Sequence, residues 1–180
     1  LDVGFSDRAV SLVEEGFDAA IRIGRPADAS LIARKLAGVG SVVVAAPAYL
    51  DRAGTPKSPA DLARYECVID TNRRDPFLWR FRAADGSRMT VTVGGRLRFS
   101  NASVSLAAAE AGFGFANLPD FVVAESLRAG RLRRLFADQQ LPLFKHMFDI
   151  SATGQADRVW RIVPRACSAI SAATACGSSY

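Results

Sequence analysis

Short extended runs alternate with helix signals along most of the chain, and this alternation is the strongest constraint on its fold. Residues 1–24 give the first example: "LDVGFSD" and "FDAAIRIG" have the apolar alternation of strands, and "RAVSLVEEG" between them has helical spacing. A strand, a helix and a strand within so few residues predict parallel pairing with a right-handed crossover. The sequence therefore predicts an α/β protein with mainly parallel sheets.

Strands and helices are also predicted to alternate in residues 96–136. The predicted strands are "RLRFSN", "FGFANLP" and "RLRRLF", and the predicted helices are "ASVSLAAAEAG" and "DFVVAESLRAG". Between the two halves, Asp85-Gly86 separates "FLWRFR" from "MTVTV", which is a strong hairpin signal. We therefore expect two lobes around a cleft, with an inter-lobe hairpin and a boundary near residues 68–75. Lobe I is expected in 1–70 and lobe II in 71–143.

The stretch "EAGFGFANLPDFVV" contains Gly112 and Gly114 and resembles the start of a phosphate-binding GxGxxG loop. Such a loop needs its glycines after a strand and before a helix, whereas these follow a helix and precede a strand. The third glycine position holds Asn117. We therefore expect Gly112 to end a helix and Gly114 to let the following strand approach its neighbour closely.

Composition narrows the function classes. The net charge is +5, but the arginines are scattered and no basic helix is evident, so charge alone does not indicate nucleic-acid binding. No apolar run approaches the roughly 20 residues of a membrane span. Three cysteines without a CxxC pair and the single His146 argue against a disulfide framework and a metal site. We found no catalytic motif and no cofactor motif, and Cys67 is expected in the core.

Two helix starts are the best candidates for ligand binding. Ser6-Asp7 and Ser100-Asn101 each follow a predicted strand, and ligands of open α/β sheets bind beyond the carboxyl ends of strands. The free backbone N–H groups of a helix start favour an anion such as a carboxylate. Arg22, near the end of a strand, could add a fixed charge. The simpler alternatives are that the four residues only cap helices and that Arg22 forms an exposed salt bridge.

A longer resemblance runs through "FSDRAVSLVEEGFDAAIRIG", "VVVAAPAYLDRAGTPKSPADLARYECV" and "GRLRFSNASVSLAAAEAGFGFANLPDFVVAESLRAGRLRRLF". These segments resemble the effector-binding domain of LysR-type transcriptional regulators, from residue 1 to about residue 137. The resemblance implies a two-lobe, type II periplasmic-binding-protein-like fold, a small-molecule effector, and a homodimer or tetramer. It also implies a cytoplasmic regulator that contacts DNA only through an N-terminal winged helix-turn-helix.

By this resemblance, the effector-binding residues are Ser6, Asp7, Arg22, Gly24, Ser100, Asn101, Asn117 and Pro119. The chain departs from the family pattern at both ends. The helix-turn-helix and the first strand–helix unit of lobe I are not evident, so we expect a fragment. Residues 144–164 resemble the strand that returns to lobe I and the start of a C-terminal helix, and 165–180 form an atypical tail that is expected to be mobile.

Two other functions remain open at this point. A free solute-binding protein of a transport system would have the same fold and a similar cleft. An enzyme on this two-lobe scaffold is the third possibility, although no residue pattern supports it.

Overall fold

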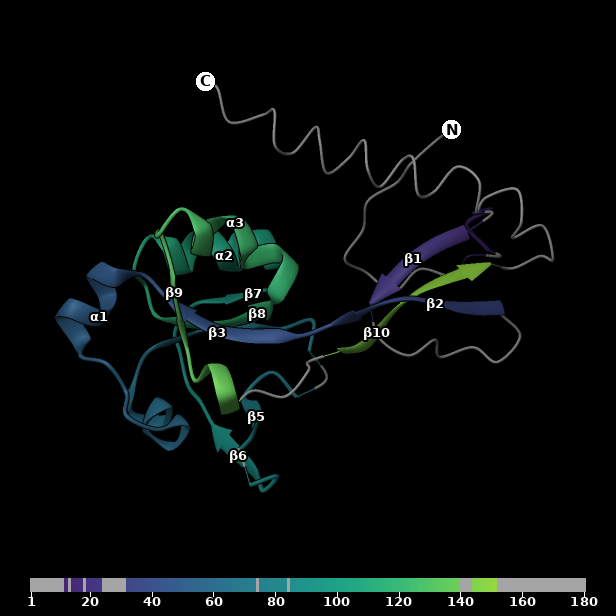
Figure 1. Ribbon diagram of the computed structural model, residues 1–180. Coiled ribbons are helices and arrows are strands. Elements are labelled where there is room, and N and C mark those ends of the chain that lie inside the picture. Colours follow the sequence, from purple (N-terminus) through teal and green to yellow (C-terminus); the bar gives the residue numbers. More distant parts are fainter. Residues whose placement is uncertain are drawn as a thin grey trace. The chain divides into compact units, whose positions relative to one another are not determined.

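The computed structural model describes residues 12, 14–17, 19–23, 32–73, 75–83, 85–139 and 144–151. The chain divides into two compact units, which are considered separately (Figure 1). The described part of the larger unit runs from Gly38 to Lys145, and the smaller unit holds the described residues before and after it.

A five-stranded sheet forms the centre of the larger unit. Its strand order is β7-β4-β8-β3-β9. The bounds are β3 Ser41–Ala45, β4 Cys67–Asp70, β7 Arg98–Phe99, β8 Phe115–Pro119 and β9 Arg133–Leu135. β4 runs parallel to both β7 and β8, whereas β3 runs antiparallel to β8 and β9. The expected parallel arrangement therefore holds on one side of the sheet, and β3 makes the whole sheet mixed.

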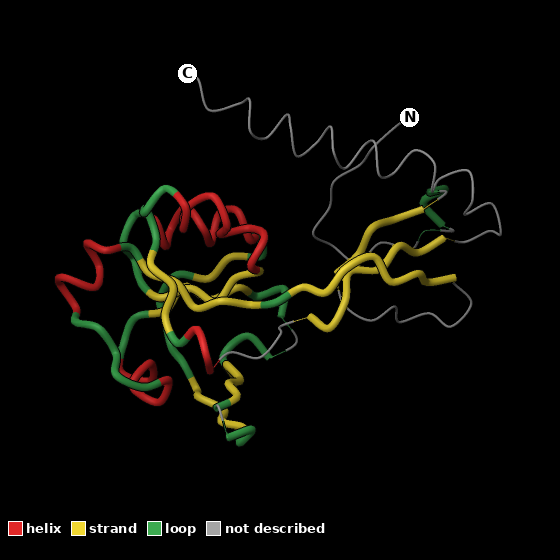
Figure 2. Tube along the Cα trace, viewed as in Figure 1, coloured by secondary structure: helices red, strands yellow, loops and turns green. Residues whose placement is uncertain are grey.

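Short helices follow the strands, as the alternating pattern predicted (Figure 2). They are α1 Pro47–Ala53, α2 Ala102–Glu110, α3 Asp120–Arg128 and the 3₁₀ helices η1 Pro59–Arg64 and η2 Ala137–Gln139. η1 begins with a capping box in which Ser58 and Asp61 satisfy each other's backbone donors. α2 and α3 pack on the sheet and on each other.

The predicted hairpin is present. β5 Leu78–Arg82 pairs antiparallel with β6 Arg88–Thr92, in a register that runs from Leu78↔Thr92 to Arg82↔Arg88. Trp79 and Phe81 are almost fully buried, and Val91 lies opposite Trp79 on the same face. One face of the hairpin therefore joins the core of the larger unit, as alternation along a strand requires.

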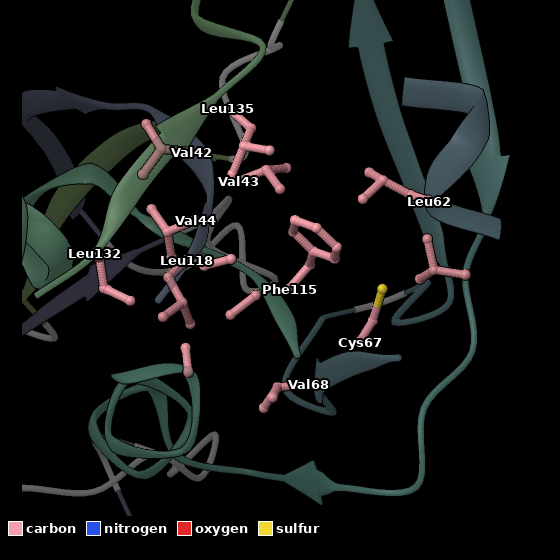
Figure 3. Close-up of a cluster of buried hydrophobic side chains, with 14 of the residues drawn as sticks. Val42, Val43, Val44, Leu62, Cys67, Val68, Phe115, Leu118, Leu132 and Leu135 are labelled. Carbon is pink, nitrogen blue, oxygen red and sulfur yellow. The ribbon is translucent and has the colours of Figure 1, made fainter. Parts of the chain in front are cut away.

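The core contains side chains from both faces of the sheet. Figure 3 shows Phe115, Cys67 and Leu62 on one side, and Leu118 and Val68 on the other. On the first side, Phe115 makes edge-to-face contacts with Tyr49 and Tyr65, with ring centroids 5.2 Å apart in each pair. β3 is buried at all five positions because it lies in the interior of the sheet.

The smaller unit contains a three-stranded sheet of order β1-β10-β2. The strands are β1 Ala19–Ile23, β2 Ile32–Val39 and β10 Phe144–Ser151. β1 pairs antiparallel with β10, from Ala19↔Ser151 to Ile23↔Met147. The strand and helix expected in residues 1–16 lie almost entirely outside the described residues, as does the tail at 165–180. In the part of the chain that the structure describes, no helix is long and apolar enough to cross a membrane.

The structure divides the chain at different positions from those expected. The sequence suggested a boundary near residues 68–75, but β3 and β4 lie in one sheet with β8 and β9. The units are instead separated near residues 38 and 145. The order of strands and helices does not show which sheet a strand joins, because that depends on pairing between segments far apart in the sequence.

Gly112 and Gly114 serve the structural purposes expected of them. Gly112 has φ 77° and follows α2, where its N–H donates to the Ala109 carbonyl at 3.0 Å and that of Phe113 donates to the Ala108 carbonyl at 3.2 Å. This pair of bonds is the Schellman arrangement that ends many helices. At Gly114, an added Cβ would lie 2.5 Å from the Glu66 carbonyl oxygen, so the two backbones can approach only without a side chain.

Replacing Gly114 tests this close approach. Gly114→Ala places a methyl group against backbone that cannot move without disturbing β4, so we expect a loss of about 3 kcal/mol in the free energy of unfolding. Gly94→Ala is the matched control, because no atom lies within 4 Å of the added Cβ there. Chemical denaturation of both variants gives the comparison, and equal stabilities would contradict the close packing at Gly114.

Candidate functional site

Three parallel strands of the larger unit end at the same edge of the sheet. β4 pairs with β7 up to Asp70↔Phe99 and with β8 through Val68↔Ala116. Thr71-Asn72 therefore follow β4 beside Ser100-Asn101, which follow β7. Neighbouring strands are about 4.8 Å apart, so these residues and the end of β8 lie within roughly 10 Å along the edge. This is the part of an α/β sheet at which ligands bind.

Hydrogen bonds join the two polar turns. The Thr71 N–H and hydroxyl both donate to the Phe99 carbonyl, at 2.8 and 3.1 Å. The Asn72 side-chain amide donates to the Ser100 carbonyl. The segment after β4 is therefore held against the segment that leads into α2, and the polar edge has a defined backbone position.

Asn101 is the N-cap of α2. Its Oδ1 accepts from the N–H groups of Ser103 at 2.9 Å and Val104 at 3.0 Å. These are two of the donors that a helix start leaves without an intrahelical partner. The expected capping role is confirmed for Asn101, while Ser100 lies exposed before it. The cap therefore occupies two donors that an anion at this helix start would otherwise use.

Asn117 lies in the middle of β8, and Pro119 is the last residue of that strand. Asn117 is only 4% exposed, and its Oδ1 has no hydrogen-bond partner among the described residues. Pro119 is buried, precedes the first residue of α3 and lies opposite Ser41. Neither side chain offers surface to a ligand in this conformation. A buried amide oxygen without a donor is uncommon and calls for a physical explanation.

The remaining predicted residues belong to the first part of the chain. The backbone of Arg22 lies in β1 opposite Phe148. Ser6, Asp7 and Gly24 lie outside the described residues. The structure therefore places Ser100, Asn101 and Pro119 at one sheet edge and Asn117 inside β8, and the role of all eight residues as ligand contacts stays a prediction.

Thr71, Asn72 and Arg73 are the residues at this edge that the sequence analysis did not select. Arg73 is partly buried, and its Nη1 is fully buried without a hydrogen-bond partner among the described residues. Burial lowers the pKa of Arg73 to about 10, against the attraction of Asp70 and Asp75, so the guanidinium remains charged at neutral pH. The rule that ligands bind after strand ends could have found these residues, had it been applied to "CVID".

A metal site and a cysteine nucleophile each place requirements on the described residues. Across the described ranges, no group of three or more His, Cys, Asp or Glu side chains is placed to hold a metal ion. Cys67 is buried in β4, and burial raises the pKa of its thiol to about 12. A thiol that stays protonated is a poor nucleophile, which agrees with the core position expected for Cys67.

Comparison with known sequences gives a family match over most of the chain. Residues 1–148 match the family described as the LysR substrate binding domain. PtxR, an HTH-type transcriptional regulator from Pseudomonas aeruginosa, is 39% identical over 138 residues, covering 76% of this chain and 43% of that protein. An uncharacterized HTH-type transcriptional regulator from Haemophilus influenzae is 33% identical over 136 residues, covering 73% of this chain and 46% of that protein. The chain thus spans less than half the length of these relatives.

Solved structures with a similar fold include regulatory proteins. The regulatory domain of CrgA, a LysR-type transcriptional regulator from Neisseria meningitidis, superimposes with a TM-score of 0.71 at 26% identity. The match covers 82% of this chain and 73% of that chain. The full-length virulence activator AphB from Vibrio cholerae gives a TM-score of 0.72 at 24% identity. This match covers 84% of this chain and 51% of that chain, and it supports the fold alone.

The buried thiol of Cys67 leads to a test of reactivity. In a Cys167→Ser/Cys176→Ser background, we expect Cys67 to resist a colourimetric disulfide reagent at neutral pH in the native protein. It should react once the protein is unfolded in guanidinium, since unfolding removes the burial that keeps the thiol protonated. The triple variant with Cys67→Ser sets the background signal. Rapid labelling under native conditions would contradict the burial.

Proposed function

Because the chain belongs to the LysR substrate-binding domain family, we propose that it is the effector-sensing part of a bacterial transcriptional regulator. In this proposal a small molecule binds the chain, and binding controls how the intact regulator engages DNA. The observation that carries the proposal is the family match over residues 1–148.

Two further observations support a regulator. The relatives described above are HTH-type transcriptional regulators, and this chain covers less than half of each. DNA binding is therefore proposed for a helix-turn-helix elsewhere in the intact protein. The same relatives favour a regulator over the solute-binding protein of a transport system, which was one of the two alternatives left open by the sequence.

The other properties of the proposed regulator follow from its class. We expect a non-enzymatic, cytoplasmic protein that assembles as a homodimer or tetramer, as LysR-type regulators do. The effector is expected to be a small anionic metabolite, because the polar sheet edge includes the start of α2, where the helix dipole favours negative charge. Ser100 and Asn101 are its proposed contacts in the larger unit, and Ser6, Asp7, Arg22 and Gly24 are those proposed from the family.

Substitutions at Asn101 separate capping from ligand binding. Asn101→Ala removes the acceptor for two backbone donors and should lower the free energy of unfolding by about 1 kcal/mol. Asn101→Asp keeps an acceptor at the cap and should preserve stability, but it places a negative charge toward the effector. Affinity should therefore fall further for Asp than for Ala.

The measurement is calorimetric titration of both variants with an effector identified from a panel of small carboxylates. Ser103→Ala, which changes an exposed side chain in the first turn of α2, is the control and should leave the affinity unchanged. Equal affinities for Asn101→Asp and the unsubstituted chain would mean that Asn101 is only a helix cap.

We also expect the 180-residue chain alone to bind DNA without sequence discrimination. Its net charge of +5 attracts phosphate, which permits weak association at low salt, but the sequence shows no helix-turn-helix pattern. Gel-shift experiments at physiological salt should show the same affinity for a candidate promoter and for a scrambled duplex of equal length. A clear preference for the promoter would contradict this expectation.

A further inference from the structure

Arg73 combines a positive charge, partial burial and an unsatisfied donor at the carboxyl edge of β4. Its Nη1 has no hydrogen-bond partner among the described residues, although it is shielded from solvent. A buried guanidinium N–H without an acceptor is costly, and native proteins keep such groups for a reason such as a bound ion or ligand. An anion that accepts the hydrogen bond would remove the free-energy penalty of this unpaired N–H group.

The neighbouring carboxylates have other bonds. Asp75 accepts a hydrogen bond from the Arg80 guanidinium at 2.6 Å. Asp70 Oδ1 accepts from the Asn72 backbone N–H at 3.0 Å. Both acids attract Arg73 electrostatically, yet neither provides an acceptor for its Nη1. The guanidinium therefore lies near two attractive carboxylates and still has one donor without an acceptor among the described residues.

The backbone position of Arg73 follows from its neighbour. Asn72, the residue before Arg73, donates to the Ser100 carbonyl, and Ser100 immediately precedes the cap of α2. Arg73 therefore lies next to the segment that begins α2. Asn101 already accepts from two helix-start donors, so a guanidinium that reaches this edge would add a positive group for an anion.

We propose that Arg73 binds the carboxylate of the effector and is the main source of its selectivity for anions. The inference rests on the proposed effector-sensing function and names a residue that the family resemblance did not select. A guanidinium can bind a carboxylate through two parallel hydrogen bonds, and its long side chain can reorient toward a ligand at the sheet edge.

The experiment uses the full 180-residue chain and thermal unfolding at constant ionic strength. Acetate, succinate and sulfate are the anionic probes, and a set of sugars and amides provides neutral ones. A carboxylate should raise the unfolding midpoint in a saturable way. Arg73→Gln should raise the half-saturating concentration at least tenfold, and Arg73→Lys should raise it less because the charge remains. Arg88→Gln, which removes an exposed arginine from β6, should leave it unchanged.

The outcomes are distinguishable. Equal responses of the unsubstituted chain and Arg73→Gln would overturn the role of Arg73 while leaving effector sensing in place. A response to neutral probes alone would overturn the anion class as well. No response to any probe would count against the proposed function itself. A lower midpoint for Arg73→Gln without ligand, with unchanged anion binding, would show that Arg73 is only structural.

Discussion

The parallel pairing of β4 with β7 on one side and with β8 on the other fixes the candidate site of the larger unit. Parallel strands end at the same edge, so the polar residues after each strand are brought together. Thr71-Asn72 and Ser100-Asn101 meet there and are joined by hydrogen bonds. Without this pairing, residues about 30 positions apart in the sequence would not lie side by side.

Close backbone packing makes this pairing possible. β8 lies against Glu66 and Cys67 at a distance that leaves no room for a side chain at Gly114. The Schellman end of α2 at Gly112 turns the chain directly into β8. The two glycines that resemble a nucleotide-binding loop therefore position the strands, and the polar edge depends on them indirectly.

Polar groups in this part of the larger unit differ in whether their hydrogen bonds are made. The Asn101 Oδ1 accepts hydrogen bonds from two backbone N–H groups of α2. Arg73 and Asn117, in contrast, each have a buried polar atom without a hydrogen bond among the described residues. A core optimised for stability alone would satisfy or replace both groups. The proposed anionic ligand would accept the hydrogen bond of Arg73, whereas the structure gives no physical explanation for the buried Asn117 oxygen.

The sequence by itself determined the local features: the hairpin at Asp85-Gly86, the Asn101 cap and the helix end at Gly112. Each depends on residues that are close together in the chain, so spacing and residue type are sufficient. Only the tertiary structure decided that β3 and β4 share a sheet with β8, and that Arg73 carries an unsatisfied donor. Strand partners and the burial of a single atom depend on contacts between distant segments, which local patterns do not encode.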